Sequence, residues 1–189
     1  MTEQELLRDC LVRLNRIGVI YYLTGSMASN YWGIPRSTHD LDFVVKIPAS
    51  AVRRLVDVFN GDYYIDEEAV VAAYRPPYQF NAIDTRSALK VDFWLAQETP
   101  FDQEMLRRRF GSTLFGETAW IATAEDVILH KLLWNALTPS ERQIADAAGV
   151  VSVQRNKLDE GYLRKWAEDL GVLPILSELL TGRIRPKHT

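Results

Sequence analysis

The hydrophobic pattern of this chain of 189 residues changes near residue 121, and this change limits the folds open to it. Before that point, short β-branched and aromatic runs typical of strands alternate with segments that have the three- and four-residue apolar spacing of helices. Beyond Thr123 only the helical spacing recurs. We therefore expect an α/β (α+β) core over residues 1–121 and a helical C-terminal extension over 122–189 that packs on the core.

Turn and capping residues give approximate bounds for the elements. Helices are expected over residues 3–17, 26–33, 48–60 and 67–74, and after Thr123, Ser140, Asp159 and Pro174. Strands are expected over residues 19–23, 39–46, 63–65, 78–83 and 89–95, with a further hairpin over 112–121.

The composition is that of a folded, soluble protein, with 47% apolar and 25% charged residues. Lys and Arg number 22 against 25 Asp and Glu, and the net charge of −3 argues against a protein that holds bulk nucleic acid by charge alone. The single cysteine, Cys10, falls on an apolar helix stripe, which indicates a buried, reduced thiol and a cytoplasmic location. Neither a signal peptide nor a membrane span is expected.

Two aspartates stand where strands disfavour them. Asp40 and Asp42 lie two apart in the expected strand 39–46, so they share one face, while Leu41 and Phe43 on the other face suit a core. Asp92 lies inside a second apolar strand. If the strands are neighbours, three carboxylates converge, which is the oxygen-rich arrangement that binds Mg²⁺ together with substrate phosphates. A solvated strand edge is the alternative.

Gly25-Ser26 ends a strand and begins a short helix. Backbone N–H groups and the serine hydroxyl at such a turn can hold phosphate oxygens at the positive end of the helix. Thirteen residues separate Ser26 from Asp40, which is enough to return the chain to a neighbouring strand. The sequence thus contains both anion-binding and metal-binding groups.

Gly25-Ser26, the spacing to Asp40-Leu41-Asp42 and a later strand carrying Asp92 together resemble the signature of the DNA polymerase β-like nucleotidyltransferase superfamily. The segment 33–45 is similar to that of small prokaryotic members, some of them toxins of toxin–antitoxin and abortive-infection systems. Residues 140–167 resemble uncharacterised proteins of the same group. The resemblance implies a short mixed β-sheet with flanking helices and a helical C-terminal part.

The resemblance also implies roles for these residues. Asp40 and Asp42 would bind two Mg²⁺ ions, and Asp92 would bind the catalytic ion and draw the proton from an attacking hydroxyl. Gly25 and Ser26 would hold the triphosphate. The reaction would move a nucleoside monophosphate from an NTP to a hydroxyl of RNA such as tRNA, of protein or of a small molecule, with release of pyrophosphate. No membrane partner is expected, and the sequence does not determine the oligomeric state.

Basic residues that could support phosphate binding are Arg36, four residues before Asp40, and Lys131 on a later helix. For Lys131 a phosphate-facing position and a snorkelling surface lysine are both open, whereas Arg142 is expected to pair with Asp146 four residues on. The P-loop pattern is absent. His39, His130 and His188 have no ligand spacing, so no zinc site is expected.

Two alternatives to an active enzyme remain. One is a catalytically weak binding or regulatory protein with this fold, such as a toxin–antitoxin component, and the other is a nucleic-acid-binding protein, which the net charge disfavours. For an enzyme, structured RNA is the favoured acceptor, because the chain has few residues with which to enclose a small molecule. The basic clusters available to RNA are Arg107, Arg108, Arg109, Arg155, Lys157, Arg183, Arg185 and Lys187.

Overall fold

The computed structural model describes residues 1–186, so Lys187 and His188 of the sequence-based predictions lie outside the described residues. The chain forms two compact units. The sheet unit consists of residues 1–24 and 38–121, and the helical unit consists of residues 25–37 and the described residues from 122 onward. The segment 25–37 therefore groups with the C-terminal helices rather than with the sheet.

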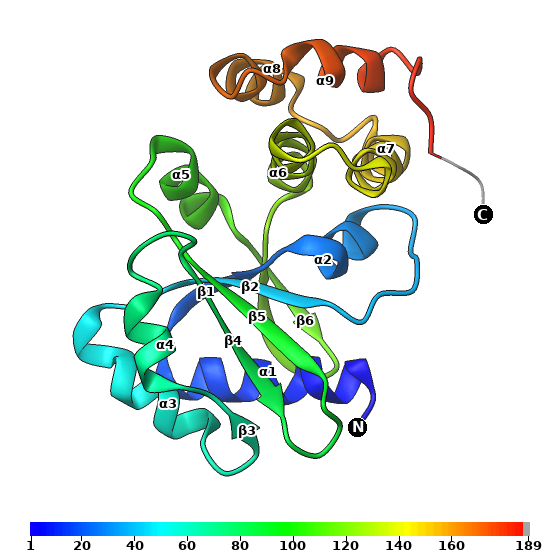
Figure 1. Ribbon diagram of the computed structural model, residues 1–189. Coiled ribbons are helices and arrows are strands. Elements are labelled where there is room, and N and C mark those ends of the chain that lie inside the picture. Colours follow the sequence, from blue (N-terminus) through cyan, green and yellow to red (C-terminus); the bar gives the residue numbers. More distant parts are fainter. Residues whose placement is uncertain (187–189) are drawn as a thin grey trace. The chain divides into compact units, whose positions relative to one another are not determined.

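The sheet unit is built on seven strands in the order β3-β4-β5-β2-β1-β7-β6 (Figure 1). β1 runs antiparallel to β2, whereas β2 runs parallel to β5, so the sheet is mixed as expected. The strands are β1 (Ile20–Leu23), β2 (Leu41–Lys46), β3 (Tyr63–Tyr64), β4 (Gln79–Asp84), β5 (Lys90–Leu95), β6 (Phe110–Leu114) and β7 (Glu117–Ile121).

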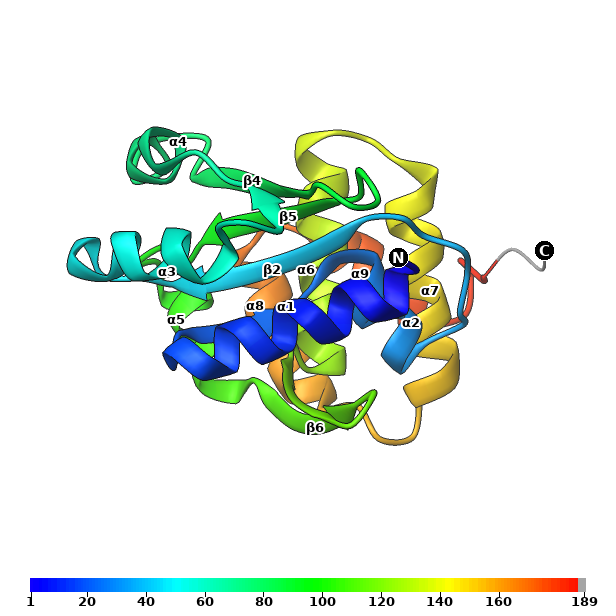
Figure 2. The same cartoon turned by 90° about the horizontal axis from the view of Figure 1, so that it is seen from below.

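One face of this sheet carries the core of the unit. Helices α1 (Glu3–Ile17) and α3 (Val52–Phe59) contact each other and lie on that face (Figure 2). Phe93 stacks against Phe43 and Phe80 on the neighbouring strands, and Phe59 of α3 meets it edge-on. Such aromatic packing stabilises the sheet strongly, because each ring buries a large apolar area.

The opposite face of the same strands is partly polar. Asp42 and Asp92 alternate with the core residues of β2 and β5 and therefore point to this second face. Here Tyr22 of β1 contacts the sulfur of Met105 on α5 (Pro100–Arg108). The short elements η1 (Ala49–Ala51) and α4 (Glu67–Ala72) complete the sheet unit.

The helical unit contains α2 (Gly25–Trp32), α6 (Ala124–Leu137), α7 (Glu141–Gln154), α8 (Glu160–Asp169) and α9 (Leu173–Leu180). Trp32 at the end of α2 donates to the carbonyl of Ala122, and Gln154 donates to the carbonyl of Trp32. Gly33 lies so close to α7 that a Cβ there would be 2.7 Å from the backbone nitrogen of Val150. Only glycine permits this approach.

Most expected elements are present, and two differences bear on function. β2 begins at Leu41, so Asp40 lies just before the strand rather than within it. The sequence pattern predicts no helix over residues 100–108, yet Thr99 caps α5 there by accepting from the backbone N–H of Asp102. Cys10 is fully buried as expected. No helix among residues 1–186 is both long and apolar enough to cross a membrane.

Candidate active site

Asp42 and Asp92 are the carboxylates that the sheet brings together. They are register partners on the parallel strands β2 and β5, so their side chains project from adjacent positions on the same face. Asp40 is exposed and precedes β2 by one residue. The expectation of two aspartates within one strand is therefore wrong for Asp40, because the extended ladder does not start until Leu41.

Asp92 is nearly buried, with 7% of its surface exposed. Its Oδ2 lies 2.8 Å from Nζ of Lys90, which is on the same face of β5, while its Oδ1 is buried without a hydrogen-bond partner among the described residues. The hydrogen bond to Asp92 raises the pKa of Lys90, and the charges of Asp92, Asp40 and Asp42 add to this against the opposing effect of burial. All three carboxylates thus act on one ammonium group.

These residues fit a hard cation in part. Two carboxylates on adjacent strands, one with a buried oxygen that lacks a donor, are the ligand type that Mg²⁺ selects. Residues 1–186 nevertheless contain no group of three His, Cys, Asp or Glu side chains positioned to hold a metal. Asp92 is instead paired with the ammonium group of Lys90, a cation supplied by the chain itself.

The phosphate-binding candidates lie in the helical unit. Gly25 has a φ of 62°, a left-handed conformation that glycine adopts without strain, and this turn leads into α2. Ser26 follows in the first turn of α2, where backbone N–H groups lack intrahelical partners. Its hydroxyl oxygen accepts a hydrogen bond from Nη2 of Arg36 at 2.7 Å. Ser26 and Arg36 are therefore neighbours.

Asn30 fixes the backbone of Arg36. The Asn30 amide donates to the carbonyl of Arg36 at 2.7 Å, and the backbone N–H of Arg36 donates to Asn30 Oδ1 at 3.1 Å. This pair of bonds ties the loop after α2 back onto the helix, so the guanidinium of Arg36 starts from a fixed position.

Asp146 of α7 joins the predicted basic residues into one cluster. Arg36 donates to it through Nε at 2.7 Å and Nη2 at 2.9 Å, and Lys131 donates through Nζ at 2.8 Å. Burial favours a raised pKa for Asp146, but the hydrogen bonds from Arg36 and the charge of Lys131 outweigh it and lower the pKa. The carboxylate is therefore ionised at neutral pH.

Two interpretations of the basic residues change as a result. Lys131 neither faces outward nor snorkels, because its side chain is 9% exposed and its ammonium is paired with Asp146 inside the unit. The expected pair of Arg142 with Asp146 is wrong, since Arg36 and Lys131 occupy that carboxylate instead. The spacing of four residues could not reveal this, because Arg36 lies 110 residues away in the sequence.

A hollow of about 250 Å³ opens beside this cluster, and its lining includes Arg36, Asp146 and Arg142. Arg36, Lys131 and Asp146, next to the hydroxyl of Ser26, together carry a net positive charge of one. Arg142 and Glu141, which also line the hollow, add one charge of each sign. Such a group of donors suits an anion with several oxygens, such as a phosphate.

Comparison with known proteins supports the fold. No protein-family model matches the chain, and no curated protein matches it. An antigenic nucleotidyltransferase-like protein from Paracoccidioides brasiliensis is similar in structure with a TM-score of 0.57 and 13% identity, over 97% of this chain and 94% of that one.

The antibiotic-resistance factor ANT(2'')-Ia is similar at the same TM-score of 0.57. Its solution structure is 12% identical and covers 93% of this chain and 96% of its own. Its crystal structure in complex with adenylyl-2''-tobramycin is 13% identical and covers 97% of this chain and 100% of its own.

The chain therefore has a nucleotidyltransferase-like fold. None of these neighbours is described as a toxin, so the resemblance to the small prokaryotic toxin branch stays a prediction.

Proposed function

We propose that this protein is a nucleotidyltransferase that moves a nucleoside monophosphate from an NTP to a hydroxyl acceptor and releases pyrophosphate. The observation that carries the proposal is the register pair Asp42 and Asp92, two carboxylates on the face of the sheet opposite its aromatic core. A strand aspartate with a buried, unpaired oxygen is costly, so its presence favours a functional role over a structural one.

The helical unit would bind the triphosphate. Gly25 and Ser26 would offer backbone N–H groups and a hydroxyl to the phosphate oxygens, and the guanidinium of Arg36 would add a charged donor 2.7 Å from that hydroxyl. Lys131 would act through its charge, since its ammonium is directed at Asp146.

Asp40, Asp42 and Asp92 would hold two Mg²⁺ ions. Bound Mg²⁺ supplies the positive charge that stabilises the attacking and leaving oxygens of an in-line displacement at the α-phosphate. Asp92 would also accept the proton of the acceptor hydroxyl, whose oxygen then bonds to the α-phosphorus while pyrophosphate leaves. Lys90 pairs with Oδ2 of Asp92, so it would compete with a metal ion for that oxygen.

The second part of the proposal concerns the kind of molecule that carries the acceptor hydroxyl. We favour structured RNA such as tRNA over protein or a small molecule, although the neighbour ANT(2'')-Ia was solved with adenylyl-2''-tobramycin. A catalytically weak binding protein or toxin–antitoxin component is the alternative. The presence of Gly25, Ser26, Asp40, Asp42 and Asp92 together favours the enzyme, because aspartates are unfavourable in a strand that binds no metal.

The test uses each of the common NTPs labelled on the α-phosphate, with Mg²⁺ and separate RNA, protein and small-molecule fractions of a cell extract. We expect label to enter the RNA fraction with the wild-type protein and not with Asp92→Asn. Label in the protein or small-molecule fraction would correct the acceptor only. No label in any fraction, or equal labelling by Asp92→Asn, would contradict the catalytic assignment.

A further inference from the structure

Asp146 is the feature that the proposed transfer reaction leaves without a role. Its side chain is 5% exposed and lies between two cations, Arg36 and Lys131, which come from other segments of the helical unit. We infer that Asp146 is a positioning residue that holds the Arg36 guanidinium against Ser26, so that both groups meet the polyphosphate of the substrate together. This inference rests on the proposed function, because it assigns Ser26 and Arg36 to phosphate binding.

The geometry of the contact supports positioning rather than simple charge balance. Arg36 meets Asp146 through two nitrogens, Nε and Nη2, at 2.7 and 2.9 Å, and such a two-point contact fixes the plane of the guanidinium as well as its distance. Nη2 also donates to Ser26 Oγ, so the same nitrogen links the carboxylate to the hydroxyl. Arginine has many rotamers in solution, and holding one of them in advance lowers the entropy cost of ligand binding.

Lys131 explains how the cluster stays positive although it contains a carboxylate. A lone pair of Arg36 and Asp146 would carry no net charge, and it would offer a triphosphate little long-range attraction. The buried ammonium of Lys131 lies 2.8 Å from Asp146 Oδ2 and offsets the negative charge of that carboxylate. The side chain of Arg36 is 29% exposed and that of Lys131 only 9%. Arg36 is therefore the cation that a ligand can reach.

Neutralising Asp146 should change the affinity for an anion in opposite directions, depending on whether Asp146 acts through its charge or by positioning Arg36. A carboxylate near an anion site repels the anion, so its neutralisation should tighten binding if Asp146 acts through charge alone. If Asp146 positions Arg36, the same neutralisation frees the guanidinium and weakens binding despite the gain of one positive charge. The direction of the change therefore separates the two roles.

The experiment is a titration of the full-length protein with inorganic triphosphate, without divalent metal, by isothermal calorimetry. We expect Asp146→Asn to raise the Kd about tenfold, in line with the loss of one charge-assisted hydrogen bond. Asp146→Glu, which keeps the charge but moves the carboxylate by one methylene, should also weaken binding. Asp169→Asn is the matched control, because it removes an exposed carboxylate of the same unit, and its Kd should stay within twofold of the wild type.

Thermal unfolding of each variant provides the check on folding, and only the Kd of folded protein is compared. If Asp146→Asn fails to fold because Lys131 loses its partner, Asp146→Glu carries the test alone. Ser26→Ala and Arg36→Gln identify the site. If both of these bind triphosphate like the wild type, the phosphate site of the proposed function is wrong, and this inference with it. If both weaken binding while Asp146→Asn and Asp146→Glu bind as tightly as the wild type or more tightly, only the inference about Asp146 is overturned.

Discussion

Lys90 is the residue that decides how the carboxylates of the sheet unit behave without a metal. Its ammonium lies 2.8 Å from Asp92, and this hydrogen bond is the main cause of the raised pKa of Lys90. The negative charges of Asp40 and Asp42 raise that pKa further. The Lys90 ammonium reduces the repulsion between Asp42 and Asp92, but it competes with any free cation for the carboxylate oxygens.

Replacing Lys90 should therefore strengthen metal binding. We expect Lys90→Ala to lower the Kd for Mn²⁺, used as a calorimetric probe for Mg²⁺, by about fivefold, since the competing charge is half-exposed and screened. Lys46→Ala is the control, because Lys46 lies on the same face of β2 but is paired with Glu98. Weaker Mn²⁺ binding by Lys90→Ala would contradict this prediction, and it would indicate that the lysine orders the carboxylates instead of opposing the metal.

An aspartate inside an apolar strand conflicts with its local context, and this conflict singles out Asp42 and Asp92 from the sequence. The structure places the two as register partners on adjacent strands, while their role in binding a metal stays a prediction. Asp146 could not be found in this way, because an aspartate on a helix is ordinary and its partner Arg36 is distant in sequence. The position of Lys131 cannot be predicted from periodicity either, because its burial depends on the tertiary contact with Asp146.

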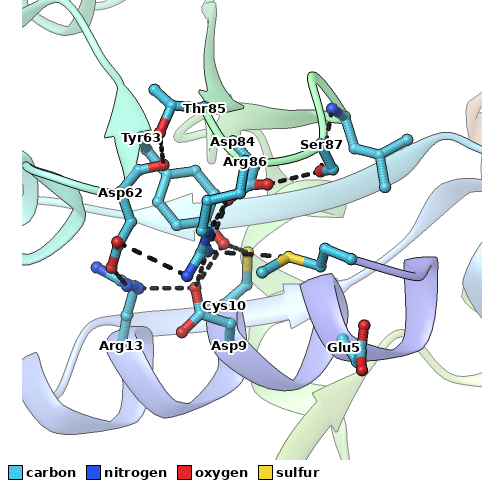
Figure 3. A network of polar contacts seen from close by, with 12 residues as sticks. Glu5, Asp9, Cys10, Arg13, Asp62, Tyr63, Asp84, Thr85, Arg86 and Ser87 are labelled. Carbon is cyan, nitrogen blue, oxygen red and sulfur yellow. Dashed lines mark hydrogen bonds and ion pairs between the residues drawn. The ribbon is translucent and has the colours of Figure 1, made fainter.

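The hairpin of β4 and β5 is anchored to α1 by a polar network that no motif in the sequence indicates (Figure 3). Arg86 in the turn pairs with Asp84 and also with Asp9 of α1. Asp9 in turn accepts from the hydroxyl of Tyr63 at 2.7 Å. Because β5 starts at Lys90, directly after this turn, the network fixes the strand that carries Asp92.

Asp84 is the buried acceptor of this network, with 0% of its surface exposed and a hydrogen bond from Ser87 at 2.6 Å. Asp84→Ala should lower the free energy of unfolding by about 2 kcal/mol, because it removes several bonds to one charged group. Urea denaturation gives the value. Asp57→Ala, which breaks an exposed helical pair with Arg53, should cost about 0.5 kcal/mol or less. Similar losses in the two variants would refute a special role for the network.

Helix α6 gives the protein a predicted sensitivity to acid. Burial, with a smaller effect of the Lys131 charge, lowers the pKa of His130 to about 4 from 6.5, and its Nε2 accepts from the indole N–H of Trp134. The folded state thus holds neutral His130, while the unfolded chain binds a proton below pH 6.5. Stability is therefore lost as the pH falls from 6.5 towards 4, by at most about 3 kcal/mol.

This dependence can be measured by urea denaturation at a series of pH values. In His130→Gln the slope between pH 6.5 and 4 should become smaller, because the variant cannot take up the proton that favours the unfolded state. His39→Gln is the control, since His39 is exposed at the surface. An unchanged slope in His130→Gln would show that other groups cause the acid sensitivity.

The order of helices and strands along the chain is easier to predict from the sequence than the pairing of strands in the sheet. Apolar periodicity predicts α1, and the N-cap Thr123 predicts α6, where its side chain accepts from the backbone N–H of Asp126. Helix α5 was missed although its apolar residues Phe101 and Met105 are four apart, since much of the segment is charged. The pairing of β2 with β5 is non-local, and no local pattern specifies it.

The whole molecule divides its charge unequally between the two units. The helical unit, taken over residues 25–37 and 122–189 of the sequence, has 10 Lys and Arg against 9 Asp and Glu, whereas the sheet unit has 12 against 16. Arg107 pairs with Glu104, and the guanidinium of Arg109 lies over the ring of Trp120. These basic residues of the sheet unit are thus engaged within it, and the helical unit is the better candidate for holding an anionic acceptor.

If the acceptor is a structured RNA, its binding must depend on salt, because Lys and Arg release counterions from the phosphates that they contact. Contact with about four phosphates predicts a slope near −3 in a plot of log K against log salt concentration, measured by fluorescence anisotropy with labelled tRNA. Replacing both Arg155 and Arg183 by Gln removes two of these contacts and should reduce the slope by about 1.5. The matched control is the double change of Arg107 and Arg109 to Gln in the sheet unit, which should leave the slope nearly unchanged because both are engaged within that unit. A flat salt dependence would exclude RNA as the acceptor while leaving the proposed nucleotidyl transfer open to protein or small-molecule hydroxyls.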